Sequence, residues 1–450
     1  MRVERADVDG DRASGRRKVL VQLNELGLRG TEISAVQFAA GLRPHGFDSV
    51  LYGPADTLPA EGPSLMDVAA EYGVEVHPVP RPASTRRAAA LWSSLADEIG
   101  ADLVHVYSQT ALRGAYLGPC RFARRPLVIT TYEMHVPEVL LTAPLLVVGT
   151  RQLEEEVGRR RGATRLISPP VDMTRDDPAA VAGGIFRARM GVGATDLLIV
   201  WVGRLSSTMK APAVESVIDA VPLLDREDIV VAVVGDGDAA DALSERADRV
   251  NERVGRRAIR FAGAMPDPRS AYAAADIGVG MGSSAARALA FGSPLVVTGE
   301  SGWSRRFDEE SAVALFRDSF WSAEKVDGAA TRLAIELRPL LEDAALRASL
   351  GGFGRAFAEE SYGLEAMAEQ LAATYREAHD RYGARAWLRD VDLELLAACA
   401  RGRDAVRPRR ARPGIGEYRF SASALPRLSG TATARARERT TQAARERTHA

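Results

Sequence analysis

Short apolar runs that alternate with amphipathic stretches are the feature of this sequence that most restricts its fold. Each run has four to eight residues and is rich in Val, Ile and Leu on both faces, as strands covered on both sides are. The stretches between them have helical length and spacing, which predicts parallel strands in an α/β fold. The runs are VLVQL, SVLYG, VEVHPV, LVHVY, LVITTY and LLVVG, then LLIVWVG, IVVAVVG, IRFAG, DIGVGMG and LVVTG.

The alternation lapses once, around Pro169 to Gly193, where the sequence has the composition of a connection. This lapse predicts two doubly wound halves. After the last strand, the segment from about Trp321 to Tyr382 has helical spacing and is expected to close the second half. The predicted parts are a first domain over 17–172, a linker over 173–196, a second domain over 197–382 and an extra helix over 383–400.

The two ends of the chain differ from the rest in composition. Residues 401–450 contain thirteen arginines and four acidic residues, a net charge of +9, and almost no aromatic residues. Such a segment cannot bury enough apolar surface to offset its ordering entropy, so we expect it to be disordered, as we do residues 1–16. The whole chain has 59 basic and 60 acidic residues, which disfavours a nucleic-acid partner.

Several compositional features bear on location. No apolar run reaches the roughly 18 to 20 residues of a membrane span, and the segment Met1 to Val19 is polar, which predicts a cytoplasmic protein.

Cys120 and Cys399 are too few for a disulfide framework or thiolate metal site and are expected to be buried as small apolar residues. Only three basic residues are lysines, an arginine bias typical of a GC-rich bacterial genome, so a lysine in a loop stands out.

Two open α/β halves place a ligand crevice outside the carboxyl ends of their sheets. Loops that open helices present free backbone N–H groups and the positive end of the helix dipole, which favours a phosphate-bearing ligand. The first strand leads into NELGLRGTEIS, where Gly30 permits close approach of a ligand and precedes Thr31. The alternative is a plain helix entry with Thr31 as the N-cap.

The second half begins with a strand, Gly203 and Arg204, a short polar loop, and Lys210 before a helix. Two cations beside the carboxyl end of a strand suit a diphosphate, because arginine offers a planar fork and lysine a compact point charge. The alternative is a pair of solvated surface charges. The scarcity of lysine in this chain favours the diphosphate site.

Two further loops of the second half have the composition of phosphate or sugar sites. Gly235 and Gly237 follow a buried strand and precede a helix. Gly282, Ser283 and Ser284 lie at a predicted helix N-terminus, where amides and hydroxyls hold phosphate or sugar oxygens. Simple capping by the serines is the alternative.

The order of these motifs resembles that of the family 4 glycosyltransferases, the glycosyl transferases of group 1. The resemblance rests on GTE after the first strand, VGRL followed by lysine, VVGDG, FAGAM, AAADIGV, RALAFGSPLVV and a final LEAMAEQLAATY helix. It spans roughly residues 18–382. It implies the GT-B fold, with two Rossmann-like domains facing a cleft, the first binding an acceptor and the second a nucleotide-sugar donor.

The resemblance also implies roles for individual residues. Gly30 and its neighbours are expected to approach the donor phosphates, and Arg204 and Lys210 are expected to hold the diphosphate. The residues implied to line the nucleotide base are Gly263, Ala264 and Met265.

One departure from the family pattern concerns its two glutamates, eight residues apart, which hold the ribose and the donor sugar. The corresponding residues here are Val279 and Arg287. A guanidinium cannot accept a hydrogen bond from a hydroxyl, so we expect either that Arg287 contacts a donor phosphate or that turnover is lost. Glu300 is the nearest carboxylate expected to reach the site, with surface exposure as the alternative.

His105 and His135 have different expected roles. His105 lies within the predicted strand LVHVY and is expected to be a hydrogen-bonded residue of the core. His135 follows a first-domain strand, close to the position at which the family has a histidine that contacts the donor sugar. When the ends of the strands are aligned exactly, Tyr132 occupies that position instead.

The resemblance implies retaining transfer of a hexose from a nucleotide diphosphate sugar to a hydroxyl of a glycan, lipid or small metabolite. Arg204 and Lys210 would stabilise charge on the departing diphosphate. Positive side chains and helix dipoles would take the place of a metal at the diphosphate, so no metal or other cofactor is expected. The alternatives are a nucleotide-sugar epimerase and a catalytically idle nucleotide-sugar binder or scaffold. The basic tail could hold the protein at an anionic membrane surface, or be a solvated extension.

Overall fold

The structure, a computed structural model, describes residues 15–60, 62–107, 112–133, 135–136, 140–158, 163–208 and 210–395. Most of them form one compact unit that ends at Val391; the other unit contains Pro137–Leu140 and the chain from Asp392 onward. The predicted disorder at 401–450, and at all but the last two of residues 1–16, lies outside the described residues. The helix predicted over 383–400 is described as far as residue 395.

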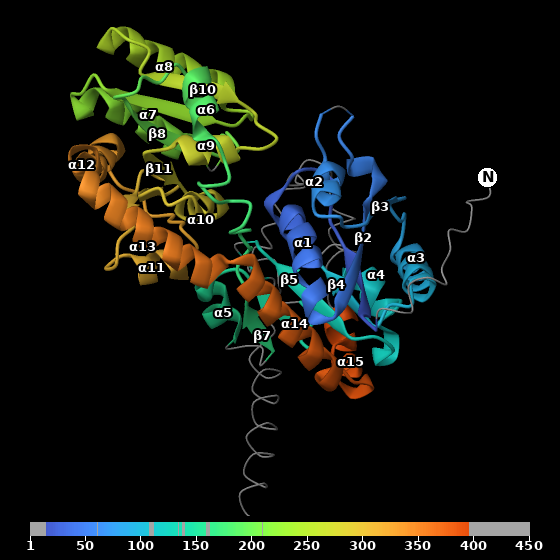
Figure 1. Cartoon of the computed structure of the whole chain (residues 1–450). Coiled ribbons are helices and arrows are strands. Elements are labelled where there is room, and N and C mark those ends of the chain that lie inside the picture. Colours follow the sequence, from blue (N-terminus) through green and yellow to red (C-terminus); the bar gives the residue numbers. More distant parts are fainter. Residues whose placement is uncertain are drawn as a thin grey trace, which may run out of the picture. The chain divides into compact units, whose positions relative to one another are not determined.

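The first sheet has seven parallel strands in the order β3-β2-β1-β4-β5-β6-β7 (Figure 1). Successive strands are added on one side of β1 and then on the other, so the order reverses between β1 and β4. Ligand crevices of open α/β sheets form at such a point. The strands are β1 (Arg17–Gln22), β2 (Phe47–Pro54), β3 (Val76–Val79), β4 (Leu103–Val106), β5 (Leu127–Thr131), β6 (Leu145–Val148) and β7 (Thr164–Leu166).

The second sheet repeats this order over six strands, β10-β9-β8-β11-β12-β13, and reverses between β8 and β11. Five of its strands are parallel, and the edge strand β13 pairs antiparallel with β12, with Thr298 opposite Ser304. The strands are β8 (Leu197–Val202), β9 (Ile229–Val234), β10 (Ile259–Gly263), β11 (Ile277–Gly280), β12 (Leu295–Thr298) and β13 (Ser304–Arg306).

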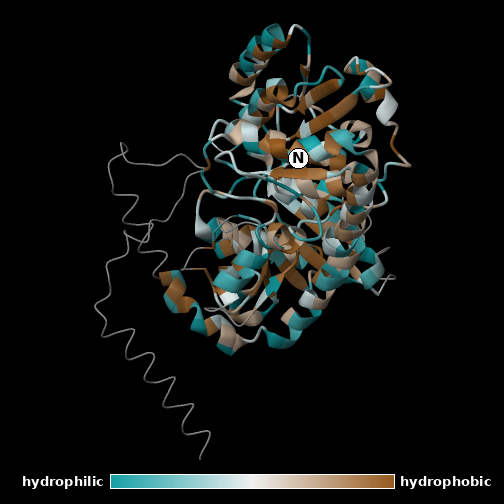
Figure 2. Ribbon diagram, turned by 90° about the vertical axis from the view of Figure 1, so that its left-hand side faces the viewer, coloured by the Kyte–Doolittle hydropathy of each residue, from teal (hydrophilic) through white to brown (hydrophobic). Residues whose placement is uncertain are grey.

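Helices cover both sheets, and their apolar sides face the apolar strands (Figure 2). The strands are buried on both faces, as their continuous apolar runs predict. In the first half the helices are α1 (Gly30–Gly41), α2 (Leu65–Glu71), α3 (Thr85–Glu98), α4 (Leu112–Leu117) and α5 (Arg151–Gly158), with 3-10 turns η2 (Arg43–His45), η3 (Ala55–Thr57) and η4 (Arg121–Ala123). The later helices are α6 (Gly183–Arg189), α7 (Ala211–Leu224), α8 (Ala240–Val254), α9 (Arg269–Ala274), α10 (Ser283–Ala290), α11 (Ala312–Arg317), α12 (Ala329–Glu342), α13 (Ala344–Tyr362), α14 (Leu364–Arg381) and α15 (Ala384–Arg389).

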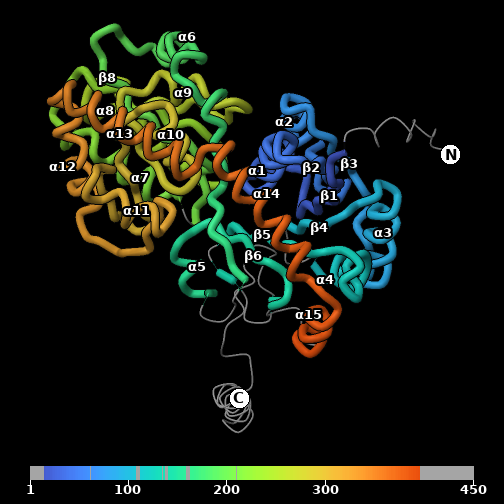
Figure 3. Tube along the Cα trace, turned by 60° about the horizontal axis from the view of Figure 1, so that its bottom comes forward, coloured from blue at the N-terminus to red at the C-terminus, as the bar shows by residue number. Residues whose placement is uncertain are grey.

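The closing helices, which the sequence assigns together to the second domain, pack in two places. Helices α12 and α13 contact elements of the second sheet. Helix α14 instead runs beside α1, and its side chains Met367, Leu371 and Tyr375 belong to the core of the first sheet (Figures 1 and 3). The core of the first half is therefore built from two stretches of chain that are distant in sequence.

The structure confirms the predicted α/β class with two doubly wound domains. Cys120 is fully buried, as predicted, whereas Cys399 lies outside the described residues. In the part of the chain that the structure describes, no helix combines the length and apolar composition needed to cross a membrane.

Candidate functional site

The loop after β8 lies at the reversal point of the second sheet, and neighbouring loops hold its backbone. The Gly203 N–H donates to the Val234 carbonyl at 3.0 Å, and the Leu205 N–H donates to the Asp236 carbonyl at 2.9 Å. The Lys210 N–H donates to the Ser206 carbonyl at 3.1 Å, just before α7 begins. These bonds hold the loop that carries both predicted cations.

Gly235 and Gly237 allow the loops after β8 and β9 to nest against each other. Both have positive φ angles, +144° and +155°. A Cβ atom on Gly235 would lie 1.8 Å from the Gly203 carbonyl oxygen, and one on Gly237 would lie 2.3 Å from the Leu205 carbonyl oxygen. Their N–H groups already donate within the protein, to the Gly263 carbonyl and to the Asp236 side chain. Both glycines thus permit close packing of the loops, and their role in donor binding stays a prediction.

Lys210 and Arg204 are neighbouring cations, and within the described residues neither forms a salt bridge, although the charge of Arg204 helps to lower the pKa of the Asp238 carboxyl group. The Lys210 Nζ lies 3.2 Å from where a Gly203 Cβ would be, and the buried Trp201 ring lies against the same position. Burial, together with the positive charge of Arg204, lowers the pKa of Lys210. Arg204 is exposed. Two cations that repel each other at this edge of the sheet favour the binding of an anion between them.

The start of α10 lies after β11, on the other side of the same reversal point. Gly282 precedes the helix with a φ of +60° and provides no side-chain cap. Its N–H donates to the Phe320 carbonyl at 3.0 Å, and the Ser284 hydroxyl donates to the Met281 carbonyl at 2.9 Å. The helix begins at Ser283, as predicted. Binding of phosphate or sugar oxygens by Gly282, Ser283 and Ser284 stays a prediction.

Arg287 of α10 forms an ion pair with the connection between the two sheet domains. Its Nε donates to Asp176 Oδ2 at 2.9 Å, and the Asp176 side chain is only 2% exposed. Burial raises the pKa of Asp176, and the Arg287 guanidinium opposes this change. Arg287 therefore has a carboxylate partner that the sequence did not indicate, and its predicted contact with a donor phosphate stays a prediction.

The segment predicted to line the nucleotide base follows β10. Gly263 has a φ of +74°, and its carbonyl accepts the Gly235 N–H at 2.9 Å, so this segment joins the nested loops. Ala264 is exposed, and Met265 packs partly buried against the core beneath. Gly263 therefore contacts the loop after β9. Lining of the nucleotide base by this segment stays a prediction.

The first domain departs from one expectation at the start of α1. The helix begins at Gly30 with Arg29 as its N-cap, so the alternative reading of Thr31 as the N-cap is wrong. The Ile33 N–H donates to the Arg29 carbonyl, because the extended backbone of Arg29 already turns the chain into the helix. The sequence reasoning missed Glu32, which is 3% exposed. The only feature of the sequence that could have indicated a special role for Glu32 is its position after an apolar strand and a glycine.

The two histidines differ in their surroundings. His105 is fully buried, and its ring nitrogens lie 2.7 Å from the Tyr375 and Thr130 hydroxyls, which confirms the predicted core position. Burial lowers its pKa to about 3, so the ring is neutral. His135 is exposed, and the Tyr132 ring packs on Gly149 with a buried hydroxyl that has no partner among the described residues. A donor-sugar contact by His135 stays a prediction.

Comparison with protein families connects this geometry to a known class. Residues 196–331, which span the second sheet and its loops, match the family described as glycosyl transferases group 1. A comparison with curated protein sequences gives no match. The family match covers the segment that contains Arg204, Lys210 and Arg287, and it confirms the resemblance that the motifs indicated.

Solved structures extend the likeness to both sheet domains. A glycosyltransferase from Rickettsia africae ESF-5 is similar with a TM-score of 0.65 and 14% identity, over 81% of this chain and 98% of its own. Anabaena HepE, in complex with UDP and glucose, has a TM-score of 0.61 and 19% identity, over 80% of this chain and 100% of its own. Sucrose-phosphate synthase from Thermosynechococcus elongatus has a TM-score of 0.58 and 17% identity, over 80% of this chain and 99% of its own. The chain therefore has the GT-B glycosyltransferase fold.

Proposed function

We propose that this protein is a retaining glycosyltransferase that moves a hexose-type sugar from a nucleotide diphosphate sugar to an acceptor hydroxyl. The observation that carries the proposal is the pair Lys210 and Arg204, two neighbouring cations that form no salt bridge within the described residues. A diphosphate supplies the charge that this pair lacks. The match of residues 196–331 to glycosyl transferases group 1 supports the reaction class.

The cations are suited to assist departure of the nucleotide. Negative charge builds on the diphosphate as the bond to the anomeric carbon breaks, and fixed cations stabilise that charge more in the transition state than in the bound substrate. Lys210 is partly buried, so its interaction with an anion is screened less than that of a surface lysine. We propose that these side chains, without a metal cofactor, neutralise the leaving group.

The nucleotide is proposed from structural likeness. HepE from Anabaena, which has the same fold, has been solved with UDP and with UDP-glucose. UDP-glucose is therefore the first donor to test for this chain. The acceptor is proposed only as a hydroxyl compound, of the glycan, lipid or small-metabolite class.

The experiment that tests the proposal compares nucleotide binding in three variants. Lys210→Ala and Arg204→Ala should each weaken UDP binding about tenfold to a hundredfold, since a hydrogen bond to a charged group contributes about 1.5 to 3 kcal/mol. Lys325→Ala removes an exposed lysine of the same domain and should leave the affinity unchanged. Isothermal titration calorimetry measures all three, and equal affinities in the wild type and both site variants would contradict the assignment.

A second candidate is a nucleotide-sugar binder without turnover. It is favoured by Arg287, which pairs with Asp176 at a position where the resemblance to the family implies a carboxylate for the donor. Nucleotide sugars are incubated with the protein and a panel of acceptors, and chromatography that resolves isomeric nucleotide sugars, followed by mass spectrometry, separates the candidates. Transfer supports the transferase, conversion of the donor to an isomer indicates an epimerase, and nucleotide binding with unchanged donor indicates the binder.

A further inference from the structure

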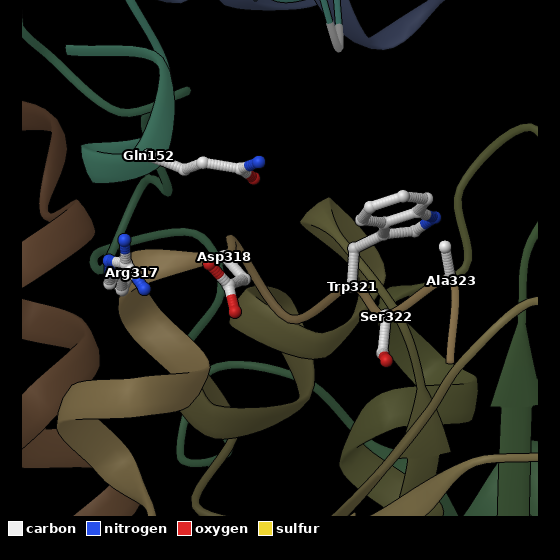
Figure 4. A pocket seen from close by; sticks show the side chains of 6 residues that line it. All are labelled: Gln152, Arg317, Asp318, Trp321, Ser322 and Ala323. Carbon is white, nitrogen blue, oxygen red and sulfur yellow. The ribbon is translucent and has the colours of Figure 1, made fainter. Parts of the chain in front are cut away.

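One pocket in the described part of the chain lies beside the loop that follows α11 (Figure 4). It encloses about 270 Å³, close to the lower end of the roughly 300–1,000 Å³ of small-molecule sites. A pocket of this size holds a single ring rather than a whole nucleotide. Its lining side chains are those of Gln152, Arg317, Asp318, Trp321, Ser322 and Ala323.

The loop that forms one wall of the pocket has an unusual backbone. Ser319 and Phe320 are consecutive non-glycine residues with positive φ angles, 51° and 55°, a conformation unfavourable for residues that have a Cβ. The Phe320 ring is fully buried against Phe307 and Tyr362. Its carbonyl accepts the Gly282 N–H. The buried ring therefore keeps the loop in this conformation, next to the start of α10.

The following residue, Trp321, is fixed at the edge of the pocket. Its indole N–H donates to Glu300 Oε1 at 2.9 Å, and the Glu300 N–H donates to the Ser322 carbonyl at 2.9 Å. The second carboxylate oxygen of Glu300 has no hydrogen-bond partner in the described ranges of the chain. Figure 4 shows the Trp321 indole and the Gln152 amide extending into the same space. An oriented aromatic side chain thus stands beside a carboxylate that can still accept hydrogen bonds.

The charges around this pocket differ from those of the Lys210 loop. Arg317 is paired with Glu155 at 2.9 Å, so its charge is compensated. Asp318 lines the pocket, and partial burial raises its pKa. Acceptors and an aromatic surface, without an uncompensated cation, suit a neutral ligand with hydroxyl groups and disfavour a phosphate.

We propose that this pocket, the Trp321 pocket, is a carbohydrate subsite in which a polyhydroxylated ring stacks on Trp321, whose indole is held by Glu300, and donates a hydrogen bond to Asp318. The C–H face of such a ring is apolar and its edge is polar, which matches an aromatic face with the Asp318 carboxylate and the Gln152 amide in the same pocket. The inference rests on the proposed function, because the ring would be the sugar of either the donor or the acceptor. The contact between Phe320 and Gly282 connects the pocket to the proposed donor loop.

The test uses the indole N–H resonance of Trp321, which is one of five tryptophans. Trp321→Phe assigns the resonance by removing it, and Trp303→Phe is the matched control. UDP-glucose or at least one methyl glycoside of a hexose panel should shift the resonance, and UDP alone should leave it in place. A resonance that does not move with UDP-glucose or any glycoside, at concentrations up to tens of millimolar, overturns the proposal. This readout needs no turnover, so a failure of UDP binding contradicts the proposed function separately.

Two binding measurements identify which ring occupies the pocket. If it is the donor sugar, Trp321→Ala should lower affinity for UDP-glucose about tenfold and leave affinity for UDP unchanged. If it is the acceptor sugar, the same change should raise the acceptor KM about tenfold while the donor KM stays constant. Trp321→Phe keeps an aromatic face and should therefore retain most of the affinity that Trp321→Ala loses. Equal effects of Trp321→Ala on UDP and UDP-glucose, with an unchanged acceptor KM, overturn the proposal.

Discussion

Glu32 is a buried carboxyl group in the first turn of α1, and its surroundings favour the protonated form. Burial, reinforced by the neighbouring Glu25 carboxylate, raises its pKa from an ordinary 4.5 to about 7, while its own backbone N–H and Arg29 act in the opposite direction. Because the native state then holds a proton that the unfolded chain releases above about pH 4.5, the free energy of unfolding falls as pH rises from 4.5 to 7.

This linkage predicts a difference between the wild type and Glu32→Gln. Between pH 5 and pH 8 the free energy of unfolding of the wild type should fall by up to about 3 kcal/mol more than that of the variant, because glutamine cannot ionise. Urea unfolding at both pH values measures the two free energies. Glu359→Gln, an exposed change on α13, should follow the wild type. A Glu32→Gln variant with the same pH dependence as the wild type would show that Glu32 ionises normally.

Individual residues were predictable from the sequence where the local pattern determines their surroundings. His105 lies in the apolar run LVHVY, and Cys120 is one of only two cysteines, too few for a disulfide framework or a thiolate metal site; both are buried as expected. Asp176 lies 111 positions before its partner Arg287, and no local pattern relates the two. The bond between Trp321 and Glu300 likewise depends on how two loops meet after folding.

At the scale of elements, the nested loops after β8 and β9 depend on glycine for steric reasons. Gly235→Ala would place a Cβ 1.8 Å from the Gly203 carbonyl oxygen, so one of the two loops must move. We expect this change to destabilise the protein and to weaken UDP binding at least tenfold, because the Gly203 loop carries both cations.

A matched substitution separates steric overlap from backbone strain. Gly255, at the end of α8, also has a positive φ, +69°, but a Cβ there would contact nothing within 4 Å. Gly255→Ala should cost only about 1 kcal/mol in unfolding free energy and leave UDP affinity unchanged. Calorimetry and urea unfolding of both variants provide the comparison. Equal UDP affinity in the Gly235→Ala variant and the wild type would show that the nesting is not required for the site.

The apolar runs predicted eleven strands, and the described part of the chain contains thirteen. The two that were missed, β7 and β13, have three residues each, and β13 reads Ser-Arg-Arg. Such short polar strands form because a neighbouring edge offers hydrogen-bond partners, and this edge exists only after the sheet has assembled. The packing of α14 on the first sheet was not predictable either, since helical periodicity identifies an apolar face but not the surface that it covers.

At the scale of the whole molecule, the basic segment 401–450 predicts an electrostatic association with anionic membranes. Each arginine near such a surface contributes about 1 kcal/mol, and salt screens this attraction. The full chain should therefore co-sediment with phosphatidylserine liposomes at low salt, and less so at high salt or with phosphatidylcholine. A chain truncated after residue 400 should stay in the supernatant. Equal sedimentation of both chains would leave the solvated extension as the explanation of the segment.

The packing of α14 against α1 has a consequence for biosynthesis. The last strand of the first sheet ends at Leu166, but the helix that completes its core begins at Leu364. At a translation rate of about 5 to 20 residues per second, the ribosome needs roughly 10 to 40 seconds to cover that interval. During this time the apolar surface that Met367, Leu371 and Tyr375 cover in the finished protein has no partner. The first domain therefore cannot complete its core until the second has been synthesised.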